Sequence, residues 1–278
     1  MYTPTICALA RKRQRGENRM DPLIITATPN ICWLHPKVEY PRTTDQILEE
    51  SLRCQEAGAS ILHIHAQDRW TEVIAGLRAG TNLIVQCGMS SLPIPKRMEV
   101  FEQKADMISI ILSHHDEAFA ELDMHVLHPR EELAQYAALS RQYGVKLEHE
   151  IWHTGSIWNL KYLIEKGLLD APHITTLFFD WPGGSWSPAT IEEYHYRRSF
   201  MPPGCVITVS AMRERQIDIL AAAILQGDHI RVGTEDYPFV RSGRLAATHE
   251  LVAEAVQLAR SLGRPLATPD QARQIAGV

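Results

Sequence analysis

The sequence predicts an α/β protein with the fold of a (β/α)8 barrel, a TIM barrel that forms a single domain. Eight short runs rich in β-branched residues alternate with longer amphipathic segments. The alternation fills about 250 residues, the usual length of such a barrel. An open doubly wound sheet would share this alternation. We consider it the weaker alternative, because no GxGxxG follows the first run and no GxxxxGK[ST] occurs in the chain.

The predicted strands are short apolar runs of the kind that a parallel sheet buries on both faces. They cover 23–28, 60–65, 82–87, 106–112, 145–150, 173–179, 204–209 and 229–232. Parallel neighbours need a crossover connection, and the segments between these runs are long enough to supply one.

The predicted helices show apolar residues at helical spacing, and glycine follows most of them. They cover 44–57, 130–142, 156–166, 214–226 and 245–262. In the first of them, Thr43 or Thr44 can cap the amino end and Gly58 can terminate the helix.

The composition favours a globular protein that acts on a small molecule. Of the 278 residues, 45% are hydrophobic and 22% are charged, and the net charge is -5. That charge gives no attraction to nucleic acid or to an anionic membrane. In addition, no apolar run reaches the roughly 18 residues that span a bilayer. From the charge and the lack of such a run, we expect neither nucleic acid nor a membrane as a partner.

The cysteines and the first residues bear on compartment and domain boundaries. The five cysteines are scattered and show no CxxC spacing, so a reducing cytoplasm fits them best. Residues 1–20 carry a basic run and lack the apolar core of a signal peptide. We interpret 1–20 as a flexible N-terminal extension and 21–278 as the barrel domain.

Two histidines one residue apart, His63 and His65, lie in the second predicted strand. Because side chains alternate along a strand, both point to the same face. Such a pair is either two hydrogen-bonded core histidines or two metal ligands. The eighth predicted strand leads into Glu235 and Asp236, and two imidazoles with one carboxylate are the ligand set of a catalytic zinc or a similar divalent ion.

Further candidate residues follow from the barrel itself, in which catalytic groups lie at the carboxyl ends of the strands. The second and eighth strands both neighbour the first, so the histidines and the carboxylates can meet at the barrel mouth. Glu148 and Glu150 share one face at the end of the fifth strand. Arg231 lies at the eighth strand, where it either assists Asp236 or forms an ion pair with it that stiffens the rim.

Several segments resemble the β-keto acid cleavage enzyme family, and the resemblance runs from about residue 23 to residue 274. They are ITAT at 25–28, HPKVEYPRTTDQILEESLRCQEAGASILHIHAQD at 35–68, GVKLEHEIWHTGSI at 144–157, PGG at 182–184 and GDHIRVGTEDYPFVRSGRLA at 227–246. The founding activity of that family is the cleavage of 3-keto-5-aminohexanoate in lysine fermentation. The resemblance implies a (β/α)8 barrel, usually in a homotetramer. It also implies an acyltransferase reaction in which a β-keto acid and acetyl-CoA, the co-substrate, give acetoacetate and a new acyl-CoA.

The resemblance implies a metal centre. It assigns zinc, or another divalent metal such as manganese or iron, to His63, His65 and Glu235. The ketone and carboxylate oxygens of a β-keto acid can chelate one such ion, which makes the C2 protons acidic.

The resemblance also implies roles for the neighbouring residues. Asp236 is the general base, Arg231 orients it, and Glu150 lines the substrate pocket. His114, after the fourth strand, becomes a candidate substrate contact.

The sequence departs from the family pattern at four places near the site. Trp33 stands where members commonly carry a glutamate, and Gln67 replaces the arginine of HxHxRD. The turn after the third strand reads Cys87-Gly88-Met89-Ser90-Ser91 and lacks a serine at the aligned position, for which Ser90 or Ser91 can substitute only if the turn shifts. The segment after Asp68 is short. We therefore expect Trp33 and Ser90 in the substrate pocket, and a neutral or apolar β-keto acid rather than an aminated one.

Two other classes of function remain open at this point. A metal-dependent hydrolase of the amidohydrolase type also uses HxH in a barrel, but typically on the first strand and with further lysine or histidine ligands. A barrel that binds a metal and has lost catalysis would agree with the altered pocket residues. Formation of acetoacetate separates the acyltransferase from both.

Overall fold

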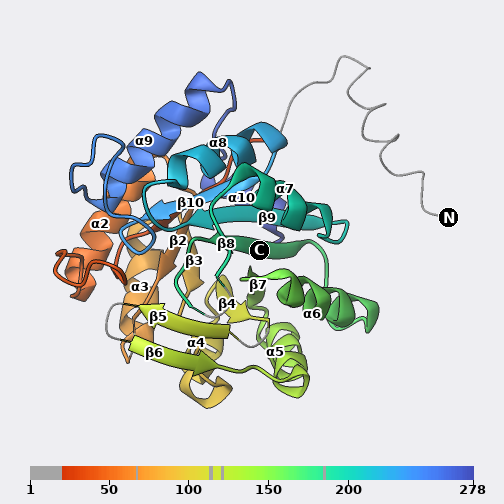
Figure 1. Ribbon diagram of the computed structural model, residues 1–278. Helices are drawn as coiled ribbons and strands as arrows, with labels where there is room; N and C mark the ends of the chain where they lie inside the picture. Colours follow the sequence, from red (N-terminus) through yellow and green to blue (C-terminus); the bar gives the residue numbers. More distant parts are fainter. Residues whose placement is uncertain (1–20, 67, 113–114, 120–121, 184–185) are drawn as a thin grey trace.

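A closed barrel of eight parallel strands forms the centre of the molecule, with helices around it (Figure 1). The structure is a computed structural model, and it describes residues 21–278 except 67, 113–114, 120–121 and 184–185. The barrel strands are β1 (Ile25–Thr28), β2 (Ile61–Ile64), β3 (Ile84–Cys87), β4 (Met107–Ile111), β7 (Lys146–Ile151), β8 (His173–Phe179), β9 (Cys205–Ala211) and β10 (His229–Gly233). They follow one another in this order, and β10 closes on β1. The predicted single-domain TIM barrel is confirmed, and the open sheet is wrong.

Side chains alternate along each strand between the helices and the barrel interior. On β2, Leu62 and Ile64 pack in the main hydrophobic core, on the side of the helices, while Ile61 and His63 point inward. The interior changes character along the barrel axis. Its floor is apolar, and the layer above it holds buried polar side chains, among them Thr26, Gln86, Glu148, Thr176, Thr208 and Arg231. Among the described residues, the polar side chains of the barrel interior therefore lie towards its carboxyl end.

The helices are α2 (Thr44–Ala57), α3 (Trp70–Gly80), α4 (Met98–Glu102), α5 (Arg130–Tyr143), α6 (Thr154–Glu165), α7 (Ile191–Ser199), α8 (Gln216–Gln226), α9 (Thr248–Ser261), α10 (Pro269–Ala276) and the 3-10 turn η1 (Ile94–Lys96). Helix α2 has its predicted bounds. Its amino end is capped by Thr43, whose hydroxyl accepts a hydrogen bond from the Gln46 N–H, and Gly58 ends it with a φ of 118°. Among the described residues, no helix is both long and apolar enough to cross a membrane.

Three predicted helices begin at other residues than expected, and one of them, α8, begins at Gln216 rather than 214. Helix α9 begins at Thr248 rather than 245, because Leu245 forms a β-bridge with Phe239 and the Ala246 N–H donates to the Pro238 carbonyl. Helix α6 begins at Thr154 rather than 156, because the His153 ring accepts a hydrogen bond from the Gly155 N–H and caps it.

The C-terminal helix α10, which the sequence pattern did not predict, closes the amino end of the barrel. Its Ala272 and Ala276 pack with Ile61, Ile84 and Met107 of the barrel floor. Substrate can therefore enter from the carboxyl end of the strands, where the candidate site residues lie.

A two-stranded antiparallel hairpin, β5 (His115–Phe119) and β6 (Leu122–Val126), follows β4 and was also not predicted. It pairs with no barrel strand among the described residues. Three sequence predictions lie outside the described residues: the extension 1–20, Gln67 and the substrate contact His114.

Candidate metal and substrate site

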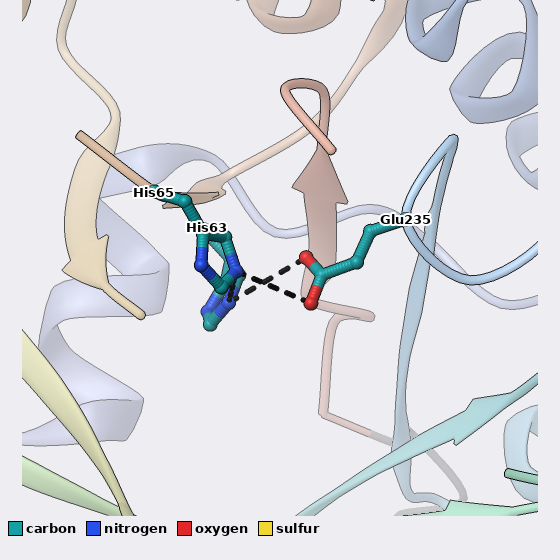
Figure 2. Close-up of side chains that lie close together, drawn as sticks. All are labelled: His63, His65 and Glu235. Atoms are coloured by element: carbon teal, nitrogen blue, oxygen red, sulfur yellow. Dashed lines mark hydrogen bonds and ion pairs between the residues drawn. The ribbon is translucent and has the colours of Figure 1, made fainter. Parts of the chain in front are cut away.

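The three predicted metal ligands lie together at the carboxyl end of the barrel. His63 is in β2, His65 is the first residue after that strand, and Glu235 lies in the loop after β10. The two Nε2 atoms are 3.1 Å apart. Glu235 Oε1 lies 3.2 Å from His65 Nε2, and Glu235 Oε2 lies 3.6 Å from His63 Nε2. Figure 2 shows both imidazoles facing this carboxylate. Across the described part of the chain, this is the one group of three such side chains close enough to share an ion.

The donor set and its spacing suit a divalent ion. A tetrahedral ion with bonds of about 2.0–2.1 Å needs ligand atoms about 3.3–3.4 Å apart, within the range that these three side chains span. Burial, with a contribution from the Arg231 charge, lowers the pKa of His63 to about 3, so the ring is neutral as a ligand must be. Burial would raise the pKa of Glu235, but Arg231, His65 and His63 outweigh it and hold that pKa well below its usual range.

Neighbouring side chains fix the orientation of both histidines. Gln86, the β3 partner of His63 in the sheet register, has its Oε1 2.8 Å from His63 Nδ1. A proton on Nδ1 leaves the Nε2 lone pair available for a metal. The Asn30 side chain donates to the His65 carbonyl at 2.6 Å and accepts from the His65 N–H at 3.0 Å. His65 Nδ1 lies 3.1 Å from the sulfur of Met89, a weaker acceptor.

The turn after β3 packs directly against the two imidazoles. A Cβ at Gly88 would lie 2.7 Å from Cε1 of His65 and 2.8 Å from the Nε2 atoms of both His63 and His65. Met89 adopts a φ of 64°, in the left-handed region. The turn that departs from the family pattern thus forms the cradle for the histidine pair, and only glycine leaves room for it.

The loop that carries Glu235 is held by a close approach of β10 to β1. A Cβ at Gly233 would lie 2.3 Å from the Thr28 hydroxyl and 2.4 Å from the Thr28 carbonyl, so a side chain there would push the strands apart. The Thr234 hydroxyl donates to the Thr28 carbonyl at 3.3 Å, and the Glu235 N–H donates to it at 3.4 Å. These contacts direct Glu235 across the barrel mouth towards β2.

Arg231 joins the metal ligands to Asp236. It lies within β10, and its Nη2 is 2.8 Å from Glu235 Oε1 and 2.9 Å from Asp236 Oδ1. Burial raises the pKa of Asp236 to about 6, the Arg231 charge opposes this rise, and the Glu235 charge adds to it. The Asp236 side chain is 0% exposed and does not line the pocket, so it lies behind the guanidinium.

Glu148 and Glu150 share the inward face of β7, as predicted, but occupy different environments. Glu150 lines the pocket, and its Oε2 accepts hydrogen bonds from the Ser90 hydroxyl at 2.8 Å and from Trp152 Nε1 at 3.0 Å. Glu148 lies deeper. Burial and then the Glu150 charge raise its pKa to about 8, although the Thr176 hydroxyl acts in the opposite direction. Glu148 is therefore mostly uncharged at neutral pH.

A pocket of about 270 Å³ opens over these residues. Its lining consists of Trp33, His63, His65, Met89, Ser90, Ser91, Leu92, Glu150, Trp152, Phe178, Trp181, Arg231 and Glu235. Trp33 and Ser90, the two predicted substrate contacts among the described residues, both line this pocket, and their role in substrate binding stays a prediction. Sequence reasoning missed Gln86, Asn30 and Phe178. Gln86 could have been found, because it occupies the inward position of β3 beside the HxH strand.

Comparison with protein families and relatives gives a consistent result. The model of the beta-keto acid cleavage enzyme family matches residues 22–278. A 3-keto-5-aminohexanoate cleavage enzyme of Fusobacterium nucleatum is 29% identical over 283 residues, which cover 92% of this chain and 98% of the relative. A 3-dehydrocarnitine:acetyl-CoA trimethylamine transferase of Rhizobium meliloti is 26% identical over 271 residues, with 84% of this chain and 88% of the relative covered.

Among solved structures, a ternary complex of ObcA with a C4-CoA adduct and oxalate superimposes with a TM-score of 0.69 at 16% sequence identity. The superposition covers 86% of this chain and 67% of that one. At this identity the likeness concerns the fold alone, and it agrees with the TIM barrel described above.

Proposed function

Since this chain belongs to the beta-keto acid cleavage enzyme family, we propose that it converts a β-keto acid and acetyl-CoA to acetoacetate and a new acyl-CoA in a metal-dependent reaction. The observation that carries the proposal is the cluster of His63, His65 and Glu235, joined through Arg231 to Asp236 at the mouth of a pocket. The relatives named above, a cleavage enzyme of a β-keto acid and an acetyl-CoA transferase, support the reaction class.

A divalent ion, zinc by the donor set, would be held by the Nε2 atoms of His63 and His65 and by the Glu235 carboxylate. When bound, it would withdraw charge from the ketone and carboxylate oxygens of the β-keto acid and make the C2 protons acidic. The neutral state of His63 and the ionised state of Glu235 support this assignment.

The remaining residues would move the proton and stabilise charge. Asp236 would accept a C2 proton, and the C2 carbanion would attack the thioester carbon of acetyl-CoA, releasing the CoA thiolate. The thiolate would attack C3, the C2–C3 bond would break, and C2 would recover its proton from Asp236 to give acetoacetate. Arg231 supplies a fixed positive charge beside the developing oxyanions. Because Asp236 lies behind Arg231, its carboxylate must turn towards the pocket when substrate binds.

The test is acetoacetate formation by the purified, zinc-loaded protein with acetyl-CoA and a panel of β-keto acids. We expect activity with at least one acid, and its loss in Glu235→Ala, whose metal content is measured in parallel. Absence of acetoacetate from every acid, in protein with one metal per chain, would reject the acyltransferase. It would favour a hydrolase or a metal-binding barrel without catalysis.

We also propose a cytoplasmic location, from the scattered cysteines, and a homotetramer, from the family resemblance. The described cysteines, Cys32, Cys54, Cys87 and Cys205, are all free, which agrees with a reducing compartment. Light scattering would test the assembly, since each chain contributes 31.4 kDa.

A further inference from the structure

The pocket wall away from the metal ligands consists of aromatic rings packed on one another. Trp152 and Phe178 stack with ring centroids 4.7 Å apart and an interplanar angle of 11°. Trp181 meets both edge to face, at 5.1 Å from Trp152 and 5.3 Å from Phe178. A set of rings that lock one another presents a rigid apolar surface to whatever part of the substrate points away from the metal.

The guanidinium group of Arg231 already packs against two of these rings, Phe178 and Trp181. The guanidinium carbon of Arg231 lies over Phe178 at 5.1 Å from the ring centroid and over Trp181 at 5.9 Å. Phe178 therefore has Trp152 and Arg231 against it. A positively charged substrate group would compete with Arg231 for the ring faces and would also be repelled by it. The wall is not an aromatic cage for a cation.

Two indole N–H groups of the pocket, those of Trp152 and Trp33, are directed at carboxylates. Trp152 Nε1 donates to Glu150 at 3.0 Å, and Trp33 Nε1 donates to Glu235 Oε1 at 3.4 Å. The Ser90 hydroxyl donates to the same Glu150 oxygen as Trp152, at 2.8 Å. These contacts turn the N–H groups of both indoles away from the substrate, and they hold the Glu150 carboxylate against the wall.

The charges of the described site residues balance once a divalent ion is bound. Glu150, Glu235 and Asp236 are the carboxylates around the pocket, and together they compensate Arg231 and a dication. Glu148 adds no charge near neutral pH. A negatively charged tail would find Arg231 and the ion already compensated, and a positively charged tail could meet only Glu150, whose Oε2 already accepts two hydrogen bonds. The desolvation of either charge would therefore be poorly compensated.

From this geometry we infer that the tail of the β-keto acid, the group on the far side of the C3 ketone, is short, uncharged and apolar. The inference rests on the proposed function and names its substrate class. A pocket of about 270 Å³ that must also admit the thioester end of acetyl-CoA leaves room for a tail of only a few carbon atoms. Trp152, Phe178 and Trp181 select the tail, and Arg231 rejects a cationic one.

Two β-keto acids of the same shape test this inference. 5,5-Dimethyl-3-oxohexanoate and 3-oxo-4-(trimethylammonio)butanoate differ only in a carbon atom that is replaced by a positively charged nitrogen. On the zinc-loaded protein we expect kcat/KM for the neutral acid to exceed that for the cation by about 100-fold. Calorimetry without acetyl-CoA should likewise give a lower dissociation constant for the neutral acid than for the cation.

A pair of tryptophan variants tests the role of the wall. Trp152→Phe keeps a ring against Phe178 but removes the N–H that Glu150 accepts, so the carboxylate gains a vacant position that a cation can fill. The preference for the neutral acid should fall by about tenfold. Trp158→Phe is the matched control, because Trp158 is 67% exposed on α6 and lies outside the pocket, and it should keep the parent preference.

Equal kcat/KM for the two acids, or a preference for the cation, would overturn the inference while leaving the proposed function intact. If no acid gives acetoacetate, the proposed function fails, and the two dissociation constants still decide the question of the tail. If the neutral acid then binds no more tightly than the cation, or shows no measurable binding, the inference about the tail is overturned. An unchanged preference in Trp152→Phe would remove Glu150 from the explanation.

Discussion

Gly88→Ala should abolish tight metal binding without unfolding the barrel. The new Cβ would lie 2.7–2.8 Å from ring atoms of His63 and His65, whereas ordinary contacts begin at 3.4 Å, so the rings must retreat by about 0.6–0.7 Å. Metal–ligand distances tolerate only about 0.2 Å. We expect zinc affinity to fall at least about 100-fold, which corresponds to about 2.7 kcal/mol.

The assay is the zinc dissociation constant, measured by competition with a chelator, together with denaturant unfolding of the metal-free protein. Gly80→Ala is the matched control, since a Cβ at Gly80, at the end of α3, meets nothing within 4 Å. Overpacking at Gly88 should cost the metal-free protein about 1–3 kcal/mol of its free energy of unfolding. If Gly88→Ala binds zinc as tightly as Gly80→Ala, the ion does not lie between these two rings, and the proposed metal centre is wrong.

Three further predictions concern the neighbouring side chains. Gln86→Leu should weaken zinc binding about 10- to 100-fold, because His63 Nδ1 loses its partner at 2.8 Å; an unchanged dissociation constant would contradict this. Asp236→Asn should lower kcat about 10²- to 10⁴-fold and more than Glu150→Gln does; the opposite order would assign the base to Glu150. Glu148 should make the free energy of unfolding depend on pH. Between the ordinary pKa of a glutamate and its raised pKa of about 8, Glu148 keeps its proton in the folded protein and loses it in the unfolded chain. As the pH rises through this range, the free energy of unfolding should fall by up to about 1.4 kcal/mol per pH unit. Glu148→Gln should remove this slope in denaturant unfolding at pH 6 and 8, and an identical slope in the variant would refute the assignment.

The barrel and the histidine pair could be predicted because local patterns determine them. Alternation along β2 places His63 and His65 on one face in any strand that is covered on the other side. The order of strands and helices then brings Glu235 beside them, because β10 and β2 both pair with β1. These inferences need only the periodicity of the chain and the closure of the sheet.

The contacts around the pair could not be predicted, because they depend on register and on turn geometry. Asn30 reaches the His65 backbone from the loop after β1, and Met89, which contacts the His65 ring, lies in a turn with a φ of 64°. Neither position carries a periodic signal. Helix α10 does carry a sequence signal, since Thr268 and Gln271 form a capping box and Pro269 is its first residue, but with eight residues it is shorter than every helix predicted above. The hairpin β5–β6 carries none of the barrel pattern, because its strands pair only with each other within the described chain.

The most direct test of the central claim is to follow the acetyl carbons. The zinc-loaded protein is incubated with acetyl-CoA labelled with ¹³C at both acetyl carbons and with an unlabelled β-keto acid, and the products are analysed by NMR. The proposed reaction places the label at C3 and C4 of acetoacetate and leaves the new acyl-CoA unlabelled. Label that stays in acetyl-CoA or appears as acetate, while the β-keto acid is consumed, would contradict acyl transfer and exclude the route through Asp236 proposed above.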